Sequence, residues 1–185
     1  CKVDGWNVGT RLILNDATDE IKEEVKKLNI NYSIFNNANL QEFYLNRMYR
    51  AYNYGVTSSA YNNICFINSD MIFSKDWLKN LLKHHDGINI PACNLIEPNI
   101  GRSPRNVPNR IEMNFGRTPD TINYEEFYKF AEKIKTEQEH FTNKAYFDDE
   151  YSVFMPIVFA KERFVDSGMY PDNMVNSPAD RYYYQ

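Results

Sequence analysis

The feature that most constrains the fold of this 185-residue chain is an alternation of strand-like and helix-like segments between Arg11 and His85. Short apolar runs predict strands, and apolar residues at helical spacing between them predict helices. This alternation is typical of a mostly parallel sheet with helices on both faces. The predicted strands cover residues 11–16, 30–37 and 63–68, and the predicted helices cover residues 17–29, 39–55 and 75–85.

The second and third predicted helices have a clear apolar face. Gly55 is expected to end the helix over residues 39–55, because glycine is the usual residue just past a helix end. The residues of these two helices that are expected to face the core are Leu40, Phe43, Tyr44, Met48, Trp77, Leu78, Leu81 and Leu82.

The rest of the chain reads as a fourth strand, a long polar loop and a second run of elements. The loop over residues 96–120 is rich in Pro, Asn and Arg, and a short strand is expected near Ile111 to Phe115. The further predictions are strands over 87–95 and 152–160, the latter with Pro156 at an edge or bulge, helices over 124–140 and 161–168, and a last helix from Ser177. We expect a single domain over residues 1–185, truncated at both ends, since the chain starts at Cys1 and its last residues resemble an interrupted helix.

Composition and charge exclude several classes of partner. The net charge of −4 provides no basic field that would attract nucleic acid or an anionic membrane. No apolar run approaches the roughly 20 residues of a membrane span, and no signal-peptide pattern is present. Three widely spaced cysteines without metal-ligand spacing indicate reduced thiols. We therefore expect a cytoplasmic location, with any membrane association made through segments outside this chain.

Two of the predicted strands end in an aspartate, Asp16 in "ILND" and Asp70 in "FINSD". Ligands of open α/β sheets bind beyond the carboxyl ends of the strands, so both carboxylates are expected at the same sheet edge. Each carboxylate could cap the next helix, bind a hydroxyl or base of a ligand, or hold Mg²⁺ or Mn²⁺ with substrate phosphates. Spacing alone leaves these roles open, together with a plain polar turn.

Five segments, in the right order, resemble family 2 glycosyltransferases, which have the GT-A fold of the nucleotide-diphospho-sugar transferases. "YNNICFINSDMIFSKDWLKNLL" resembles the family's strand, its Asn-x-Asp variant of the metal motif and the helix that follows. The other four are "RLILNDATDE", "AYNYGVTSSAYNN", "MPIVFAKERFVDSGMYPDN" and "SPADRYYYQ". The resemblance implies a Rossmann-like three-layer α/β/α sandwich with a mostly parallel mixed sheet.

The same resemblance implies an activity and a set of site residues. The activity is metal-dependent, inverting transfer of a sugar from a nucleotide donor, expected to be a UDP-sugar, to a hydroxyl of a glycan, protein or lipid-linked acceptor. Asp70 would hold Mn²⁺ or Mg²⁺ at the donor diphosphate, and Asp16 would bind the nucleotide base. Asn53 and Asn68 fall in the family's donor-binding motifs, and Asp180 would be the general base that takes the acceptor proton.

The sequence departs from the family pattern at three positions, and two other functions remain open. Asn15 and Asn68 stand where the family often has acids, and Ala179 stands where many members have Glu. These departures leave room for a non-catalytic relative that binds a nucleotide sugar, a glycan or a partner protein. A sugar nucleotidyltransferase, suggested by "GTRL", is the third possibility, although the expected run after that motif is missing.

Overall fold

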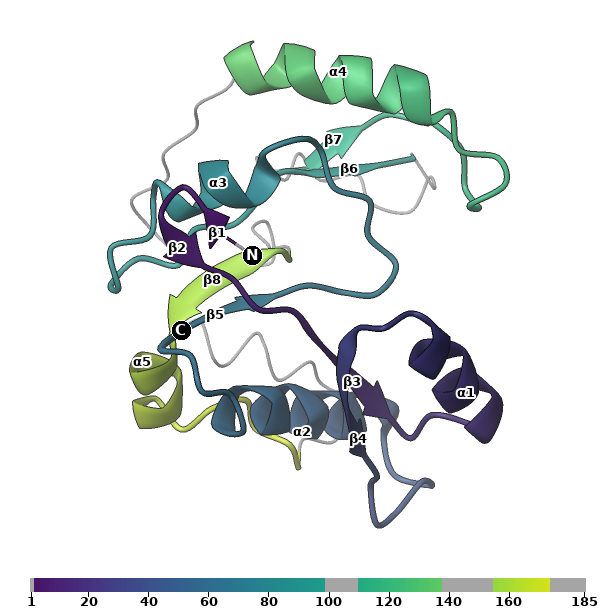
Figure 1. Ribbon diagram of the computed structural model, residues 1–185, viewed down its shortest axis with the longest axis vertical. Coiled ribbons are helices and arrows are strands. Elements are labelled where there is room, and N and C mark those ends of the chain that lie inside the picture. The colour runs from purple at the N-terminus through teal and green to yellow at the C-terminus, as the bar shows by residue number, and fades with distance from the viewer. Residues whose placement is uncertain (1, 99–109, 138–154, 174–185) are drawn as a thin grey trace. The chain divides into compact units, whose positions relative to one another are not determined.

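The structure is a computed structural model that describes residues 2–98, 110–137 and 155–173. The chain forms two compact units, a first unit of Cys1–Ile64 and Ala160–Gln185 and a second unit of Cys65–Phe159 (Figure 1). The predicted last helix and Asp180 lie outside the described residues, as do residues 138–140 and 152–154 of two other predicted elements.

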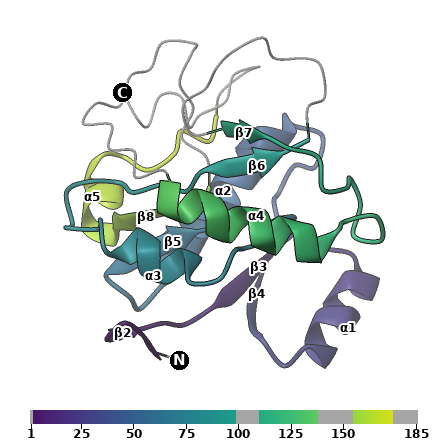
Figure 2. The same ribbon diagram turned by 90° about the horizontal axis from the view of Figure 1, so that it is seen from above.

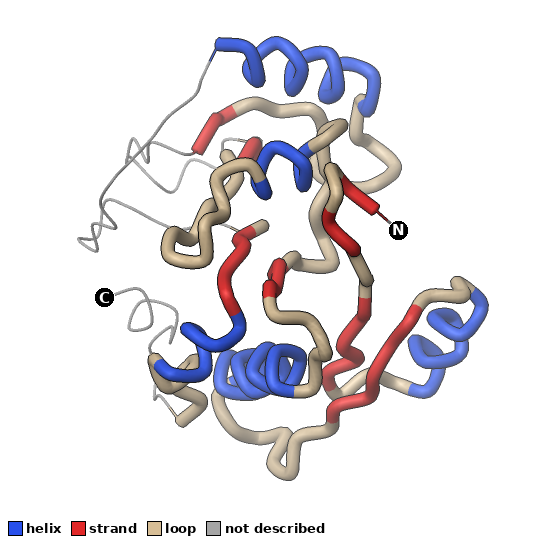
Figure 3. Tube along the Cα trace, turned by 60° about the vertical axis from the view of Figure 1, so that its left-hand side comes forward, coloured by secondary structure: helices blue, strands red, loops and turns tan. Residues whose placement is uncertain are grey.

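The predicted mixed α/β class is confirmed, with helices and strands alternating along most of the chain. The described residues form four two-stranded sheets, with the strand pairs β1–β2, β3–β4, β5–β8 and β6–β7. Figure 3 shows how short the strands are beside the loops and turns that connect them. Within the described ranges, no helix combines the length and the apolar character that a membrane span requires.

The first unit contains the βαβ segment that the sequence predicted. β3 (Arg11–Asn15) pairs in parallel with β4 (Asn31–Phe35), and α1 (Asp19–Lys27) connects them (Figure 2). α1 starts where the Thr18 hydroxyl accepts a hydrogen bond from the Ile21 N–H, a normal N-cap arrangement. The pairing brings Asn15 opposite Phe35, so both strands end at the same level. A short hairpin of β1 (Lys2–Val3) and β2 (Trp6–Asn7) precedes this segment.

α2 (Tyr44–Thr57) differs from its prediction at both ends. It begins at Tyr44 instead of Asn39, because the Asn39 side chain accepts a hydrogen bond from the Gln41 N–H and favours a turn there. It also continues through Gly55, so Gly55 does not end the helix. An added Cβ at Gly55 would lie 3.4 Å from Ile13 Cγ1 of β3, which is close to an ordinary packing distance.

The buried face of α2 also differs from the predicted one. Leu40 and Tyr44, which were expected to face the core, are exposed, and the residues that the helix buries are Asn46, Tyr49, Ala51 and Val56. Phe35 of β4 stacks on Tyr54 with ring centroids 5.0 Å apart. The polar Asn46 therefore belongs to the inward face, and a search for apolar residues alone could not place that face correctly.

α5 (Lys161–Asp166) ends as predicted before Gly168, which has a φ of 93°. The turn that follows is fixed on α2 by the Asn53 amide, whose Nδ2 donates to the Tyr170 carbonyl at 2.9 Å. The Asn53 Oδ1 accepts from the Tyr170 N–H at 3.1 Å, so both ends of the amide are used. Tyr170 is almost fully buried and packs against the rings of Tyr49 and Phe164.

The second unit contains the core around the strand pair of β5 (Asn63–Phe66) and β8 (Ile157–Ala160). The boundary between the two units falls within β5 and at the end of β8. Phe66 packs edge-on against Phe159, with ring centroids 4.8 Å apart. α3 (Trp77–Leu82) is shorter than predicted; it buries Leu81 and Leu82, whereas Trp77 is half-buried and stacks on Phe73.

The fourth strand predicted over residues 87–95 is wrong. The Asp86 carboxylate accepts hydrogen bonds from the N–H groups of Ile88 and Asn89, and Pro91 has no N–H, so these groups cannot join a strand ladder. A single bridge joins Ala92 to Ile157. The strand that does form is β6 (Leu95–Glu97), which pairs in parallel with β7 (Arg110–Glu112), close to the predicted short strand.

The helix predicted over residues 124–140 is present as α4 (Tyr124–Glu137). The Asn123 side chain accepts from the Glu126 N–H at 3.2 Å and caps its first turn. One face of α4 is apolar and packed, because Ala131 is buried and Phe127 and Phe130 pack against Phe115.

Among the glycines that the structure describes, Gly116 is the one for which a side chain is least tolerable. Its φ is 125°, and an added Cβ would lie 2.3 Å from the Thr121 carbonyl oxygen. Both atoms belong to the turn that leads into α4, so the backbone itself would have to move. We predict that Gly116→Ala lowers the free energy of unfolding by roughly 3 kcal/mol in urea denaturation.

Gly87 provides the matched control in the same unit. Its φ of 81° is also left-handed, but nothing lies within 4 Å of an added Cβ. Gly87→Ala should therefore lower the free energy of unfolding by only about 1 kcal/mol, the cost of a left-handed backbone at alanine. Equal losses in the two variants would contradict the close contact at Gly116.

Candidate functional site

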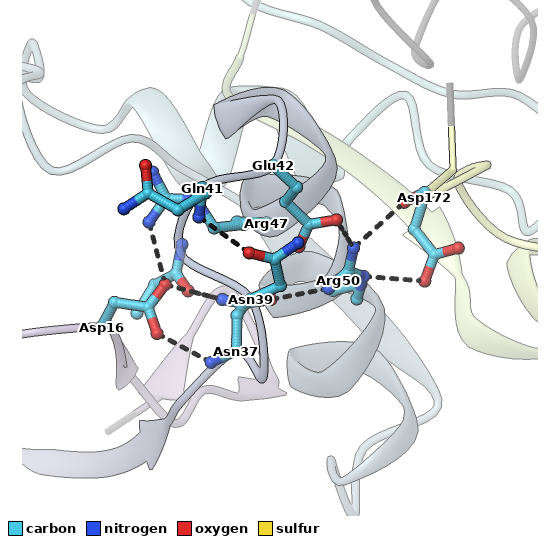
Figure 4. Close-up of polar contacts among 9 residues, drawn as sticks. Asp16, Asn37, Asn39, Gln41, Glu42, Arg47, Arg50 and Asp172 are labelled. Carbon is cyan, nitrogen blue, oxygen red and sulfur yellow. Dashed lines mark hydrogen bonds and ion pairs between the residues drawn. The ribbon is translucent and has the colours of Figure 1, made fainter. Parts of the chain in front are cut away.

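The candidate site is the carboxyl end of the β3–β4 pair in the first unit, where Asp16 is surrounded by hydrogen-bond donors (Figure 4). Asp16 Oδ1 accepts the Asn37 backbone N–H at 2.7 Å, and Oδ2 accepts Asn37 Nδ2 at 2.8 Å. Arg47 Nη1 on α2 adds an ion pair to Oδ2 at 3.2 Å. The Asp16 side chain is 11% exposed, so it keeps partial contact with solvent.

The local backbone explains why Asp16 and Asn37 meet. Asn15 and Phe35 are paired at the ends of two parallel strands, and the Asp16 N–H donates to the Phe35 carbonyl at 2.9 Å. Asp16 then turns away with a φ of 51°, a conformation that aspartate tolerates better than most residues. The Asn37 amide also donates to Asn15 Oδ1 at 2.9 Å, so one asparagine closes the ends of both strands.

Arg50 extends this network to the turn after α5. Its Nη1 donates to Asn37 Oδ1 at 3.2 Å, and its Nη2 bonds the Glu42 carboxylate just before α2. Its Nε lies 3.5 Å from Asp172 Oδ2, and its Nη2 lies 3.4 Å from the Asp172 carbonyl oxygen (Figure 4). The site thus combines two guanidinium groups with three carboxylates in one connected set.

The electrostatics keep the principal groups charged. Burial by itself would raise the pKa of Asp16, but the bonds from the Asn37 backbone, the Asn37 amide and Arg47 outweigh burial and lower that pKa below its ordinary value of 3.8. The Glu42 hydrogen bond raises the pKa of Arg50 against the effect of burial. Asp16 is therefore an anion, and Arg50 a cation, at neutral pH.

The site has hydrogen-bonding capacity that the protein does not use. Glu42 Oε1, Asn46 Oδ1 and Arg47 Nε are buried and have no hydrogen-bond partner in the described part of the chain. A carboxylate offers about four lone-pair positions, and the three bonds to Asp16 leave one position open on Oδ1. The network therefore has hydrogen-bonding capacity left over at Asp16 Oδ1 and at these three buried atoms.

The predicted site residues fall into three places. Asp16 and Asn53 both lie in the first unit, but the Asn53 amide is bonded at both ends to the Tyr170 backbone and acts as part of the scaffold. Asn68 and Asp70 lie in the second unit after β5 and are exposed, with Asp70 in a turn. Asp180 lies outside the described residues. β3 and β5, which were expected to share one sheet edge, belong to different two-stranded sheets.

Sequence reasoning missed five members of the network, Asn37, Glu42, Arg47, Arg50 and Asp172. Asn37 carried a signal, because the second predicted strand also ends in polar residues, Asn36 and Asn37. Arg47 and Arg50 carried a weaker one, since they lie three residues apart on one helix face next to buried positions. Asp172 carried no signal of this kind in the sequence.

The metal prediction has a limited structural basis. In the ranges that the structure describes, no group of three or more His, Cys, Asp or Glu side chains is arranged to hold a metal ion. Asp70 offers a single exposed carboxylate in a turn, which suits Mg²⁺ or Mn²⁺ only when substrate oxygens complete the coordination. Cys65 and Cys93 are free, and burial raises their pKa to about 12 and about 11, so they are neutral thiols.

Comparison with protein-family models, curated proteins and solved structures finds no match for this chain.

The depressed pKa of Asp16 predicts a pH-dependent contribution to stability. The contribution is complete above the ordinary pKa of 3.8 and is lost as the pH falls through the lower pKa of the folded state. Asp16→Asn removes the charge and places an amide N–H₂ among donors. We predict that the variant is about 2 kcal/mol less stable than wild type at neutral pH and that this difference shrinks as the pH falls below 3.8.

Urea denaturation at a series of pH values measures this difference. Asp120→Asn, which changes an exposed carboxylate in a turn of the second unit, is the control and should stay within about 0.5 kcal/mol of wild type. A difference between wild type and Asp16→Asn that does not change with pH would contradict the ion pair.

Proposed function

We propose that the chain is a sugar transferase of the GT-A type, in which a three-layer α/β/α fold binds a nucleotide sugar at the carboxyl ends of its strands. The observation that supports this proposal most is the ionised, partly exposed Asp16 carboxylate at the end of a parallel strand pair, with an unused lone pair on Oδ1. Ligands of α/β sheets bind at this kind of edge. The resemblance of five segments to family 2 glycosyltransferases supplies the rest.

In this proposal Asp16 accepts an N–H of the nucleotide base, and a UDP-sugar is the first donor to test. The uracil ring carries an N–H between two carbonyl groups, and a carboxylate with a free lone pair is its natural acceptor. Arg47 and Asn37 hold the carboxylate in place, so the acceptor is already oriented before the base arrives. GDP- and dTDP-sugars are the alternative donors.

The transfer itself would use Asp70 and Asp180. Asp180 would take the proton of an acceptor hydroxyl on a glycan, protein or lipid-linked acceptor while the hydroxyl oxygen bonds the anomeric carbon. The bond from that carbon to the diphosphate oxygen breaks on the opposite side, which inverts the configuration. Asp70 would hold Mn²⁺ or Mg²⁺, whose chemistry is to neutralise the charge that develops on the leaving diphosphate. The location that we propose is the cytoplasm, with any membrane attachment made outside this chain.

A second candidate is a non-catalytic relative that binds a nucleotide sugar, a glycan or a protein. The observation that favours it is the full engagement of Asn53, one of the expected donor-binding residues, in holding the Tyr170 backbone. The two candidates share the Asp16 site and differ in whether sugar is transferred. A sugar nucleotidyltransferase would instead release pyrophosphate from a nucleoside triphosphate.

Thermal unfolding with UDP, GDP and dTDP, each with and without Mn²⁺, tests the proposal. A nucleotide at about 100 times its dissociation constant stabilises the folded state by roughly 2.7 kcal/mol. We predict this stabilisation for UDP only when Mn²⁺ is present, and we predict that Asp70→Asn abolishes the stabilisation by UDP with Mn²⁺.

Asp120→Asn is the matched control, because Asp120 is likewise an exposed aspartate in a turn of the second unit. It should respond to UDP and Mn²⁺ as wild type does. Release of UDP from a UDP-sugar that is lost in Asp180→Asn would separate the enzyme from the non-catalytic relative. If none of the three nucleotides stabilises the protein, the result would count against the transferase and against a relative that binds a nucleotide sugar.

A further inference from the structure

Arg50 bonds three positions of the first unit, two in the connection between β4 and α2 and one that is remote in sequence. Its guanidinium contacts Asn37 after β4, Glu42 before α2 and Asp172 after α5 (Figure 4). Asp172 is 122 residues further along the chain than Arg50. The hydrogen bond with Glu42 raises the pKa of Arg50, so the guanidinium stays charged whenever the protein is folded.

The bond to Asn37 decides which way the Asn37 amide faces. An amide has an oxygen that only accepts and an N–H₂ that only donates. Because Arg50 Nη1 donates to Asn37 Oδ1 at 3.2 Å, the Nδ2 group must lie on the opposite side. There it donates to Asp16 Oδ2 at 2.8 Å and to Asn15 Oδ1 at 2.9 Å. Arg50 thus favours, together with the acceptors Asp16 and Asn15, the amide orientation in which a donor meets the carboxylate.

Only a guanidinium can make this set of contacts. Its planar fork presents Nη1 to Asn37 and Nη2 to Glu42, and directs Nε toward Asp172. A lysine has the same charge but a single ammonium group, so it cannot hold three acceptors in these directions. The orientation of Asn37 therefore depends on the contacts with Glu42 and Asp172 as well.

We propose that Arg50 is a positioning residue that acts on Asp16 through Asn37 and links the Asp16 carboxylate to the turn at Tyr170–Asp172. Arg50 does not contact Asp16 itself through any hydrogen bond within the described ranges. Its effect on ligand binding rests on the proposed function, because that function assigns a ligand to Asp16. Its effect on the Asp16 carboxylate does not depend on any ligand.

Titration of the Asp16 carboxyl carbon by NMR tests the first effect in the whole chain, with the signal assigned from Asp16→Asn. Arg50→Lys keeps the positive charge but loses the fork, and Arg50→Met loses both. In both variants Asn37 would no longer be held with Nδ2 toward the carboxylate. We therefore expect the midpoint of the Asp16 titration to move to a higher pH in both, and further in Arg50→Met. The shift in Arg50→Lys reports orientation separately from charge.

Arg11→Lys is the matched control. Arg11 is another arginine of the first unit that bonds α2, through the Gly55 carbonyl at 3.2 Å and the Ser58 hydroxyl at 3.1 Å, and it contacts neither Asn37 nor Asp16. It should leave the Asp16 midpoint unchanged even if it lowers stability. An unchanged midpoint in both Arg50 variants would overturn the proposal, as would an equal shift in Arg11→Lys, which would indicate general loosening.

Binding of UDP with Mn²⁺ by the same variants tests the second effect. Loss of a properly oriented donor to a charged group should weaken binding roughly tenfold in Arg50→Lys, while Arg11→Lys should bind as wild type does. If wild type binds no UDP, the proposed function fails, but the titration still decides the role of Arg50. If UDP binds equally well to all variants and the Asp16 midpoint does not move, the positioning role fails while the function stands.

Discussion

The interaction on which the first unit depends is the bond of the Asp16 carboxylate to its three donors. A carboxylate at 11% exposure would be unfavourable without partners, and burial alone raises its pKa. Two donors of Asn37 and one of Arg47 reverse that effect. They also fix the ends of β3 and β4 against α2, so the charge and the architecture stabilise each other. This arrangement creates a preformed acceptor at the edge of the strands.

α2 is the element that connects this acceptor to the rest of the unit. One side of the helix presents Arg47 and Arg50 to the strand ends, and Asn53 to the Tyr170 backbone. The same helix leaves Asn46 Oδ1 and Arg47 Nε buried without a hydrogen-bond partner among the residues that the structure describes. An unpaired buried polar atom costs about 1–3 kcal/mol.

Much of the fold could be predicted from the sequence, because its signals are local. The β3–α1–β4 segment follows from apolar runs, an N-cap threonine and charges of the right sign at each helix end. The start of α2 and the strand over 87–95 were wrong for one physical reason. Asn39 and Asp86 use their side chains to bond nearby backbone N–H groups, and this competes with regular structure. Asp16 could be chosen because it ends a strand, whereas Arg50 could not, since its partner Asp172 is remote in sequence. The roles of Asp70 and Asp180 stay predictions.

The most direct test of the central claim is a titration of the isotope-labelled chain with UDP and Mg²⁺, followed by NMR of the backbone and side-chain amides. If Asp16 is the base acceptor, the largest changes should appear at the Asn37 N–H, at the Asn37 amide and at the Arg47 guanidinium, which share its two oxygens. The same changes should disappear in Asp16→Asn. Binding that leaves these three signals unmoved, or that persists unchanged in Asp16→Asn, would contradict the account.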